Sequence, residues 1–167
     1  RSVVNNKFES NVPGIYAIGD IVEGPQLAHK ATAEGIALAD IFAGKEPCVD
    51  TKLVPSCIYT HPNIAVVGLS EAQAKEQNIP IVTGKVVTGA NGKSVVNQDS
   101  SGFAKLIAHA DSHKILGGSM MCVNSTDMIG EITTAIANDM TAEDLVLGMR
   151  AHPTLNESVG KAALTII

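Results

Sequence analysis

The residues best suited to acid–base chemistry lie close together near the end of the sequence, in the stretch RAHPTLNES at residues 150–158. The proline in this stretch fixes its own φ and disfavours helical geometry before it, so His152 should lie in a loop. A helix should begin shortly afterwards, with Thr154 or Asn156 as its cap. A sharp turn at the proline could then fold Glu157 back against the imidazole ring.

A histidine paired with a carboxylate can move protons near neutral pH. Imidazole has an unperturbed pKa of about 6.5. A carboxylate on one ring nitrogen fixes the tautomer and supports the imidazolium, which leaves the other nitrogen to exchange a proton with a substrate. On the His-x₄-Glu spacing alone, a surface or capping histidine beside a solvated glutamate is the favoured interpretation, so the rest of the chain has to decide.

Composition excludes several classes of function. The chain has 167 residues, 45% of them hydrophobic, which suffices for one domain with a core or for one domain and part of another. Its net charge of −5, the absence of a basic block and an aromatic content of 3% argue against nucleic-acid binding. No apolar run is long enough for a membrane span, and the start shows no signal-peptide pattern.

The three cysteines, Cys48, Cys57 and Cys122, are far apart and show no metal-ligand spacing. We therefore predict no metal site, and we expect reduced, mostly buried thiols in a protein of the cytoplasm. A nucleophilic cysteine paired with His152 stays open as an alternative, although nothing in the sequence supports it.

The first 50 residues resemble part of a ligand-binding α/β domain. Residues 1–9 favour a strand or its edge, and the apolar run at 15–20 is typical of a buried parallel strand. Asp20 ends this run, where open α/β sheets bind ligands, although a turn or capping role is the simpler alternative. A helix rich in small residues is expected at 26–42. Its first N–H groups can face an electron-rich ligand atom.

The pattern changes after a polar connector at 45–52, where we place a domain boundary. Residues 51–167 are predicted to form an independent α+β domain, an antiparallel sheet flanked by helices. The expected strands are 53–59, 64–69, 81–88, 103–110 and 114–123, with a turn at 89–92; the expected helices are 71–78, 125–138 and 142–149, followed by a last helix from 155.

Four stretches in fixed order resemble one known family: NVPGIYAIGD, GPQLAHKATAEG, VPSCIYTHPNIAVVGLSE and AHPTLNES. They are similar to the C-terminal part of the dihydrolipoamide dehydrogenases, within the FAD-dependent pyridine nucleotide–disulfide oxidoreductase family. Together they cover residues 8–158. A single stretch would be weak evidence, whereas the four together are specific.

The resemblance implies roles for particular residues. Asp20 matches the carboxylate that binds the ribityl chain of FAD, and His152 and Glu157 match the catalytic acid/base and the carboxylate that orients it. The residues that match the segment whose backbone contacts the isoalloxazine ring are Gln26, Leu27, Ala28 and His29. The His61–Pro62 and His152–Pro153 bonds match positions where the family tends to carry cis peptides.

The resemblance also implies partners and a reaction. The domain from residue 51 onward matches the interface domain, through which the family forms homodimers and brings the histidine of one subunit to the active site of the other. The substrate would be dihydrolipoamide on the lipoyl domains of 2-oxo acid dehydrogenase or glycine cleavage complexes, with NAD⁺ as the electron acceptor. His152 would take the proton of the dithiol, and the thiolate would attack a protein disulfide.

Several family features are missing from the sequence. It contains no C-x-x-x-x-C pair and no G-x-G-x-x-G loop, and it begins at Arg1 within an expected strand. We therefore expect a piece of a longer enzyme that is inactive by itself and binds little FAD. Arg150 stands where many relatives carry another histidine. The alternatives are a relative of the glutathione or mercuric reductases, and a non-catalytic dimerisation module.

Overall fold

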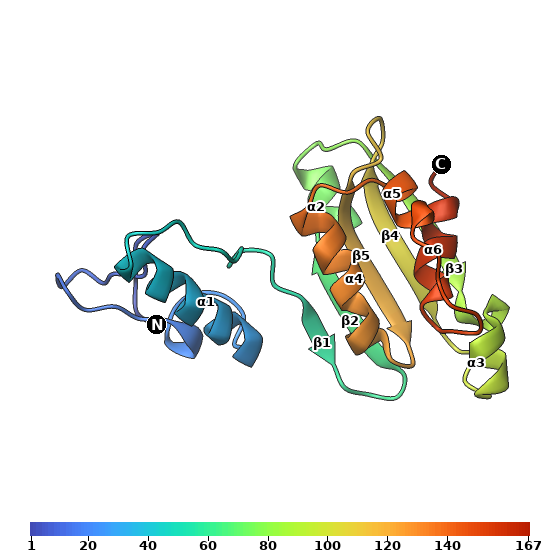
Figure 1. Cartoon of the computed structure of the whole chain (residues 1–167), viewed down its shortest axis with the longest axis horizontal. Helices are drawn as coiled ribbons and strands as arrows, with labels where there is room; N and C mark the ends of the chain where they lie inside the picture. Colours follow the sequence, from blue (N-terminus) through green and yellow to red (C-terminus); the bar gives the residue numbers. More distant parts are fainter. The chain divides into compact units, whose positions relative to one another are not determined.

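The computed structural model describes all residues, 1–167, and the chain forms two compact units, Arg1–Val54 and Pro55–Ile167. Figure 1 labels their helices and strands, and each unit is described by itself.

The Arg1–Val54 unit contains one α-helix and little other regular structure. The strands expected at 1–9 and 15–20 do not form: a single antiparallel bridge joins Glu9 to Tyr16, and Ile15 is exposed. A strand requires a neighbour that accepts and donates along its whole length, and within this unit no other extended segment pairs with these residues. The apolar run was therefore predicted correctly as a hydrophobic segment and wrongly as a buried parallel strand.

The helix α1, Ala28–Phe42, begins two residues later than predicted, and the 3₁₀ helix η1, Gly19–Ile21, precedes it. A buried ion pair links Lys30 to Glu34 at 2.6 Å, and the second carboxylate oxygen of Glu34 accepts the Gly19 N–H at 2.7 Å. Gly19, the first residue of η1, is therefore fixed to α1 by this hydrogen bond.

The Pro55–Ile167 unit is built on one antiparallel sheet of five strands, in the order β1-β2-β5-β4-β3. The α+β class predicted from the sequence is confirmed. The strands are β1 Ser56–Ile58, β2 Asn63–Gly68, β3 Ile81–Val87, β4 Phe103–His109 and β5 Ile115–Cys122.

Helices connect or follow these strands. They are α2 Glu71–Glu76, η2 Thr88–Ala90, α3 Gly92–Val96, α4 Ser125–Ala137, α5 Ala142–Leu147 and α6 Glu157–Leu164. The turn predicted at 89–92 is wrong, because it contains η2 and the start of α3. Asn91 caps α3, with its side-chain oxygen accepting the Ser94 N–H at 3.1 Å.

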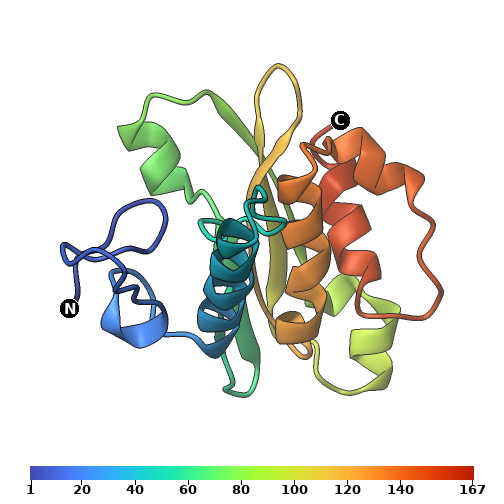
Figure 2. The same cartoon turned by 60° about the vertical axis from the view of Figure 1, so that its left-hand side comes forward.

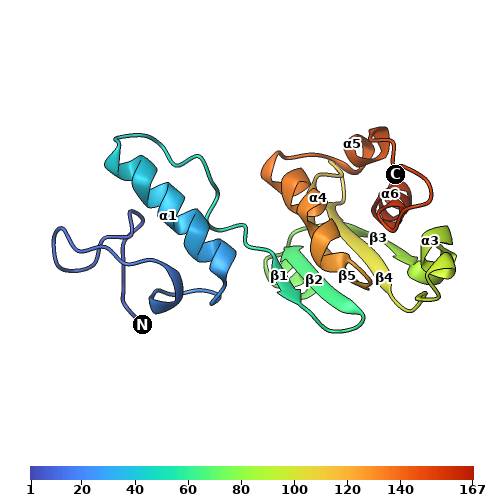
Figure 3. The same cartoon turned by 60° about the horizontal axis from the view of Figure 1, so that its bottom comes forward.

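The core lies between the sheet and the helices α4 and α6, which run side by side on the same face (Figures 1 and 3). Figure 2 shows the same arrangement from another side, with both helices on one side of the sheet. Helix α4 packs on β2 and β5, and α6 packs on β3 and β4. Ile132 of α4 is fully buried, as its place in the amphipathic stripe predicted.

Small residues in the sheet let these helices approach closely. Gly118 lies under the Ile132 side chain, and Gly84 lies under the α6 backbone, where a Cβ built on Gly84 would overlap the carbonyl oxygen of Ala162. Because backbone cannot move aside as a side chain can, residue 84 fixes the height of α6 above the sheet.

We expect Gly84→Ala to destabilise the Pro55–Ile167 unit by about 1–3 kcal/mol, because the methyl group forces α6 away from β3. The matched control is Gly130→Ala in α4, where a built Cβ meets no atom within 4 Å. That change should stabilise the unit by roughly 0.5–1 kcal/mol through helix propensity. Urea unfolding of both variants measures the difference. Equal stabilities for the two would contradict the packing.

Candidate active site

The stretch that carries His152 runs from the end of α5 to the start of α6. The His152–Pro153 peptide is cis, and so is the His61–Pro62 peptide, as the resemblance implied. Glu157 is the first residue of α6, and its carboxylate folds back over the turn. The carboxylate oxygens lie 3.1 and 3.2 Å from His152 Nδ1, and one of them accepts the Thr154 N–H at 2.8 Å.

The expected caps of α6 are wrong. Asn156 occupies the N-cap position, but its backbone is helical and its side chain makes no capping bond; its amide donates to Glu131 of α4 instead. The Thr154 hydroxyl donates to the Ala151 carbonyl at 2.8 Å. The Glu157 carboxylate accepts an N–H that precedes the helix, and its charge lies in the first turn of α6, where it is favoured by the positive end of the helix.

The charge and exposure of the pair suit proton transfer. The pKa of Glu157 is held below its usual value by the Thr154 N–H and, second, by His152. The side chain of Glu157 is 18% exposed and that of His152 is 75% exposed. Because an ionised carboxylate only accepts, Nδ1 carries the hydrogen of their bond and Nε2 remains available to a substrate.

Residues distant in sequence hold the turn in place. The buried side chain of Asn91 donates from Nδ2 to the Thr154 carbonyl at 3.0 Å and to the Ser158 hydroxyl at 3.2 Å. This role of Asn91 could not be predicted from the sequence, because Asn91 and Thr154 are 63 positions apart and no local pattern links the two.

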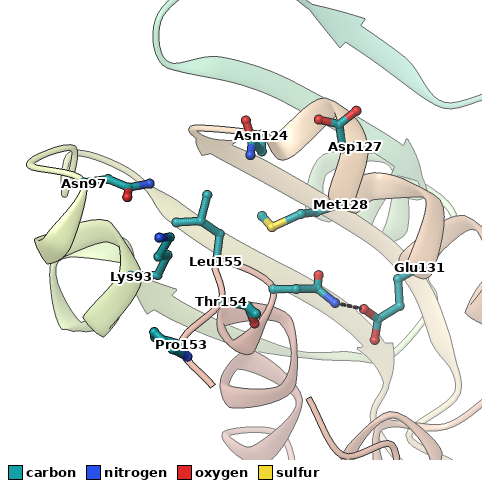
Figure 4. A pocket seen from close by; sticks show the side chains of 10 residues that line it. Lys93, Asn97, Asn124, Asp127, Met128, Glu131, Pro153, Thr154 and Leu155 are labelled. Atoms are coloured by element: carbon teal, nitrogen blue, oxygen red, sulfur yellow. Dashed lines mark hydrogen bonds between the residues drawn. The ribbon is translucent and has the colours of Figure 1, made fainter. Parts of the chain in front are cut away.

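A pocket of about 400 Å³ adjoins the turn, between α3 and α4. In Figure 4, Lys93 and Asn97 line one side, Glu131 lies on the other, and Leu155 points into the space between them. The pocket has both polar and apolar walls, and residues 153–156 of the turn form part of its surface.

The predicted flavin-binding residues all lie in the Arg1–Val54 unit. Asp20 is exposed within η1. Gln26 precedes α1, Leu27 is its N-cap residue, and Ala28 and His29 form its first turn. The structure therefore places this set around η1 and the start of α1, and places His152 and Glu157 in the other unit.

The cysteines offer no activated nucleophile. Thiols that are mostly buried were expected; Cys122 is buried, Cys57 is half-buried and Cys48 is exposed, and no disulfide forms. Burial raises the pKa of Cys122 to about 11 and also raises that of Cys57, and a hydrogen bond with Asp40 raises the pKa of Cys48. A thiol with a raised pKa is a poor nucleophile, which argues against a Cys/His hydrolase.

Comparison with known families identifies the group to which the chain belongs. The family described as "Pyridine nucleotide-disulphide oxidoreductase, dimerisation domain" matches residues 54–163, and "Pyridine nucleotide-disulphide oxidoreductase" matches residues 1–35. The chain belongs to the pyridine nucleotide-disulphide oxidoreductase family. The resemblance inferred from the sequence is thereby confirmed.

Curated members of this family align along almost the whole chain. It is 41% identical over 164 residues to dihydrolipoyl dehydrogenase 1, mitochondrial, of Arabidopsis thaliana, covering 98% of this chain and 32% of that protein. It is 43% identical over 159 residues to dihydrolipoyl dehydrogenase of Bacillus subtilis, covering 95% of this chain and 34% of that protein. The chain thus spans about a third of the length of these relatives.

Solved structures of other proteins share the fold. The crystal structure of LpdA from Mycobacterium tuberculosis superposes with a TM-score of 0.93 at 22% identity, covering 99% of this chain and 36% of that one. A copper(II) complex of the HOCl-induced flavoprotein disulfide reductase RclA from Escherichia coli gives 0.89 at 25% identity, covering 99% and 38%. None of the helices in this chain has the length and apolar character needed to cross a bilayer.

The lowered pKa of Glu157 predicts how the turn responds to acid. The ionised carboxylate contributes stability above its usual pKa of 4.5, and that contribution is lost as the pH falls through the lower folded-state pKa. Glu157→Gln removes the charge and keeps an acceptor oxygen. The stability difference between the natural chain and this variant should therefore shrink below pH 4.5. Unfolding measured between about pH 7 and pH 3 tests this, and a pH-independent difference would contradict it.

Proposed function

We propose that this chain supplies the acid/base pair, part of the flavin site and the dimer interface of a FAD-dependent dihydrolipoyl dehydrogenase. One observation carries the proposal: His152 Nδ1 lies 3.1 Å from the Glu157 carboxylate while the ring remains 75% exposed. Residues 1–50 are assigned to the FAD-binding domain and residues 51–167 to the interface domain. The names of the curated relatives support the choice of reaction.

The proposed chemistry begins with a proton. A free thiol has a pKa of about 8.5, so the substrate dithiol is mostly protonated near pH 7 and must be activated. His152 Nε2 accepts the proton of one thiol, and Glu157 stabilises the imidazolium. The thiolate then attacks a protein disulfide, forming a mixed disulfide and releasing one protein sulfur as a thiolate.

The second substrate thiol completes the exchange. It attacks the mixed disulfide, closes the lipoyl disulfide and leaves the protein as a dithiol. The sequence contains no C-x-x-x-x-C pair, so the reacting disulfide has to come from another part of the protein. FAD supplies the path by which the two electrons reach NAD⁺, so that one dithiol and one NAD⁺ yield one disulfide, one NADH and one proton.

The residues around η1 fit one side of a flavin. The Asp20 carboxylate is exposed and would bind ribityl hydroxyls, and its loop is fixed through the Gly19–Glu34 bond. Leu27 provides no side-chain cap for α1, which leaves the positive end of a 15-residue helix for an electron-rich atom of the ring. The backbone of the segment Gln26–His29 would lie against that ring.

The acid/base role predicts a selective loss of activity. In the full-length protein, His152→Gln should lower kcat for dihydrolipoamide oxidation by about 10²–10⁴-fold, the usual contribution of a general base. NADH oxidation by ferricyanide should change little, because it needs no thiol proton. The control is His61→Gln. His61 also precedes a cis proline, and its Nε2 lies 2.8 Å from a carboxylate oxygen of Asp99. Equal losses for both variants would contradict the assignment.

The proposed homodimer rests on the dimerisation-domain match. The Pro55–Ile167 unit also exposes large apolar side chains at Leu147, Met149 and Leu164, which suits a surface that a partner covers. Sedimentation equilibrium of the chain should give about twice its mass of 17.3 kDa. A monomer at every concentration would contradict a dimer made by this part alone.

Partners and location complete the proposal. Lipoyl domains of a 2-oxo acid dehydrogenase or glycine cleavage complex are the proposed substrates, and the cytoplasm is the proposed location. The alternatives predict other outcomes. A glutathione- or mercuric-reductase type would oxidise NAD(P)H with a different substrate. A non-catalytic module would dimerise while the full-length protein lacked dithiol oxidation.

A further inference from the structure

A charged side chain next to the turn is almost fully withdrawn from solvent. Arg150 is 12% exposed and forms an ion pair with Glu131 of α4. Its Nη1 also donates to two carbonyls at the end of α5, those of Leu145 and Gly148, at 3.0 Å each. Three acceptors therefore converge on one guanidinium, a planar group with fixed donor directions.

Glu131 joins both ends of the turn. One carboxylate oxygen accepts from Arg150, two residues before His152, and the other accepts from the Asn156 amide, immediately before Glu157. The dashed line at the Glu131 carboxylate in Figure 4 marks a hydrogen bond at the edge of the pocket. The residues that flank the proposed acid/base pair are thus tied to the same carboxylate, on a helix packed against the sheet.

The neighbouring helix leaves space for this guanidinium. A Cβ built on Gly160 of α6 would stand 2.5 Å from Arg150 Nη1 and 3.0 Å from its Cζ. The guanidinium therefore lies directly on the α6 backbone, at a position without a side chain. Arg150 therefore pairs with Glu131 of α4 and packs against the backbone of α6.

We propose that Arg150 is a positioning residue. Through Glu131 and Asn156, it holds the turn in the conformation that keeps His152 within hydrogen-bond distance of Glu157. The inference rests on the proposed function. Glu157 is the hydrogen-bond partner of the otherwise exposed His152 ring, so the backbone of the turn sets the orientation of the imidazole. Loss of Arg150 leaves Glu131 partly buried without its cation, and frees the turn to move.

The first test needs no activity. The Thr154 amide donates to Glu157, so its hydrogen exchange in the 167-residue chain reports whether the turn is closed. Arg150→Ala and the milder Glu131→Gln should each speed this exchange about tenfold or more. The control is Glu71→Gln, which removes the Lys105–Glu71 ion pair of 2.6 Å at the sheet and should leave Thr154 unchanged.

Gly160→Ala gives a second variant that keeps every charge. Its methyl group should displace the guanidinium and speed Thr154 exchange. The double variant Gly160→Ala/Arg150→Ala should exchange no faster than Arg150→Ala alone, because the guanidinium is then absent. Unchanged exchange in Arg150→Ala and Glu131→Gln would overturn the inference, and so would an effect equal to that of Glu71→Gln.

Kinetics of the full-length protein separate this inference from the proposed function. Arg150→Ala should lower kcat for dihydrolipoamide oxidation about 10- to 100-fold with little change in ferricyanide reduction, and should have no further effect in a His152→Gln background. If Arg150→Ala lowered kcat by the same factor in the His152→Gln background as in the natural protein, its role would be generally structural, and the inference would be overturned. If His152→Gln itself retains full activity, the proposed function fails, and the exchange result then decides the structural part alone.

Discussion

The Glu157 carboxylate is the group on which the geometry of the turn depends. It accepts the Thr154 N–H and faces His152 Nδ1, so one charge both stabilises the start of α6 and fixes the imidazole. A side chain that accepted only the Thr154 N–H would leave the ring free to rotate. A side chain that only contacted the ring would leave the turn without an acceptor. Because both bonds converge on one carboxylate, the local fold of the turn and the orientation of the imidazole depend on the same group.

Packing in the core sets the positions of the helices on either side of the turn. Helix α6 reaches its position because Gly84 admits its backbone, and α4 reaches its position because Gly118 admits Ile132. Two contacts then hold the turn: Asn91, the N-cap residue of α3, donates to the Thr154 carbonyl, and Glu131 of α4 accepts from Asn156. An exposed histidine can therefore be well oriented without being buried, because Asn91 and Glu131 both hold the turn that carries it.

Sequence reasoning succeeded where the interactions are local. The His152–Glu157 contact spans five residues, so a turn at the proline could suggest it, although the spacing alone favoured a solvated glutamate. It failed for Asn91, which joins the turn across 63 residues, and for the capping of α6, because the Asn156 amide is taken by Glu131 on another helix. The contacts of Asn91 and Asn156 join segments that are distant in sequence, so the spacing of residues could not predict them.

The first twenty residues show a different limit. An apolar run such as Ile15–Ile18 has the composition of a buried strand, but a strand forms only when other strands pair with it, and composition carries no information about those partners. The same reasoning explains why the antiparallel sheet was predicted well. Three of its four strand pairs, β1–β2, β3–β4 and β4–β5, join strands that are consecutive in sequence, and only β2–β5 does not.

The most direct measurement of the central claim is the rate of flavin reduction by dihydrolipoamide in the full-length protein, followed by stopped flow across pH. If His152 is the base, the rate should fall on the acidic side as the imidazole becomes protonated, and that dependence should disappear in His152→Gln along with most of the rate. An acid limb of the same size in His152→Gln would contradict the account, because another group would then be accepting the thiol proton.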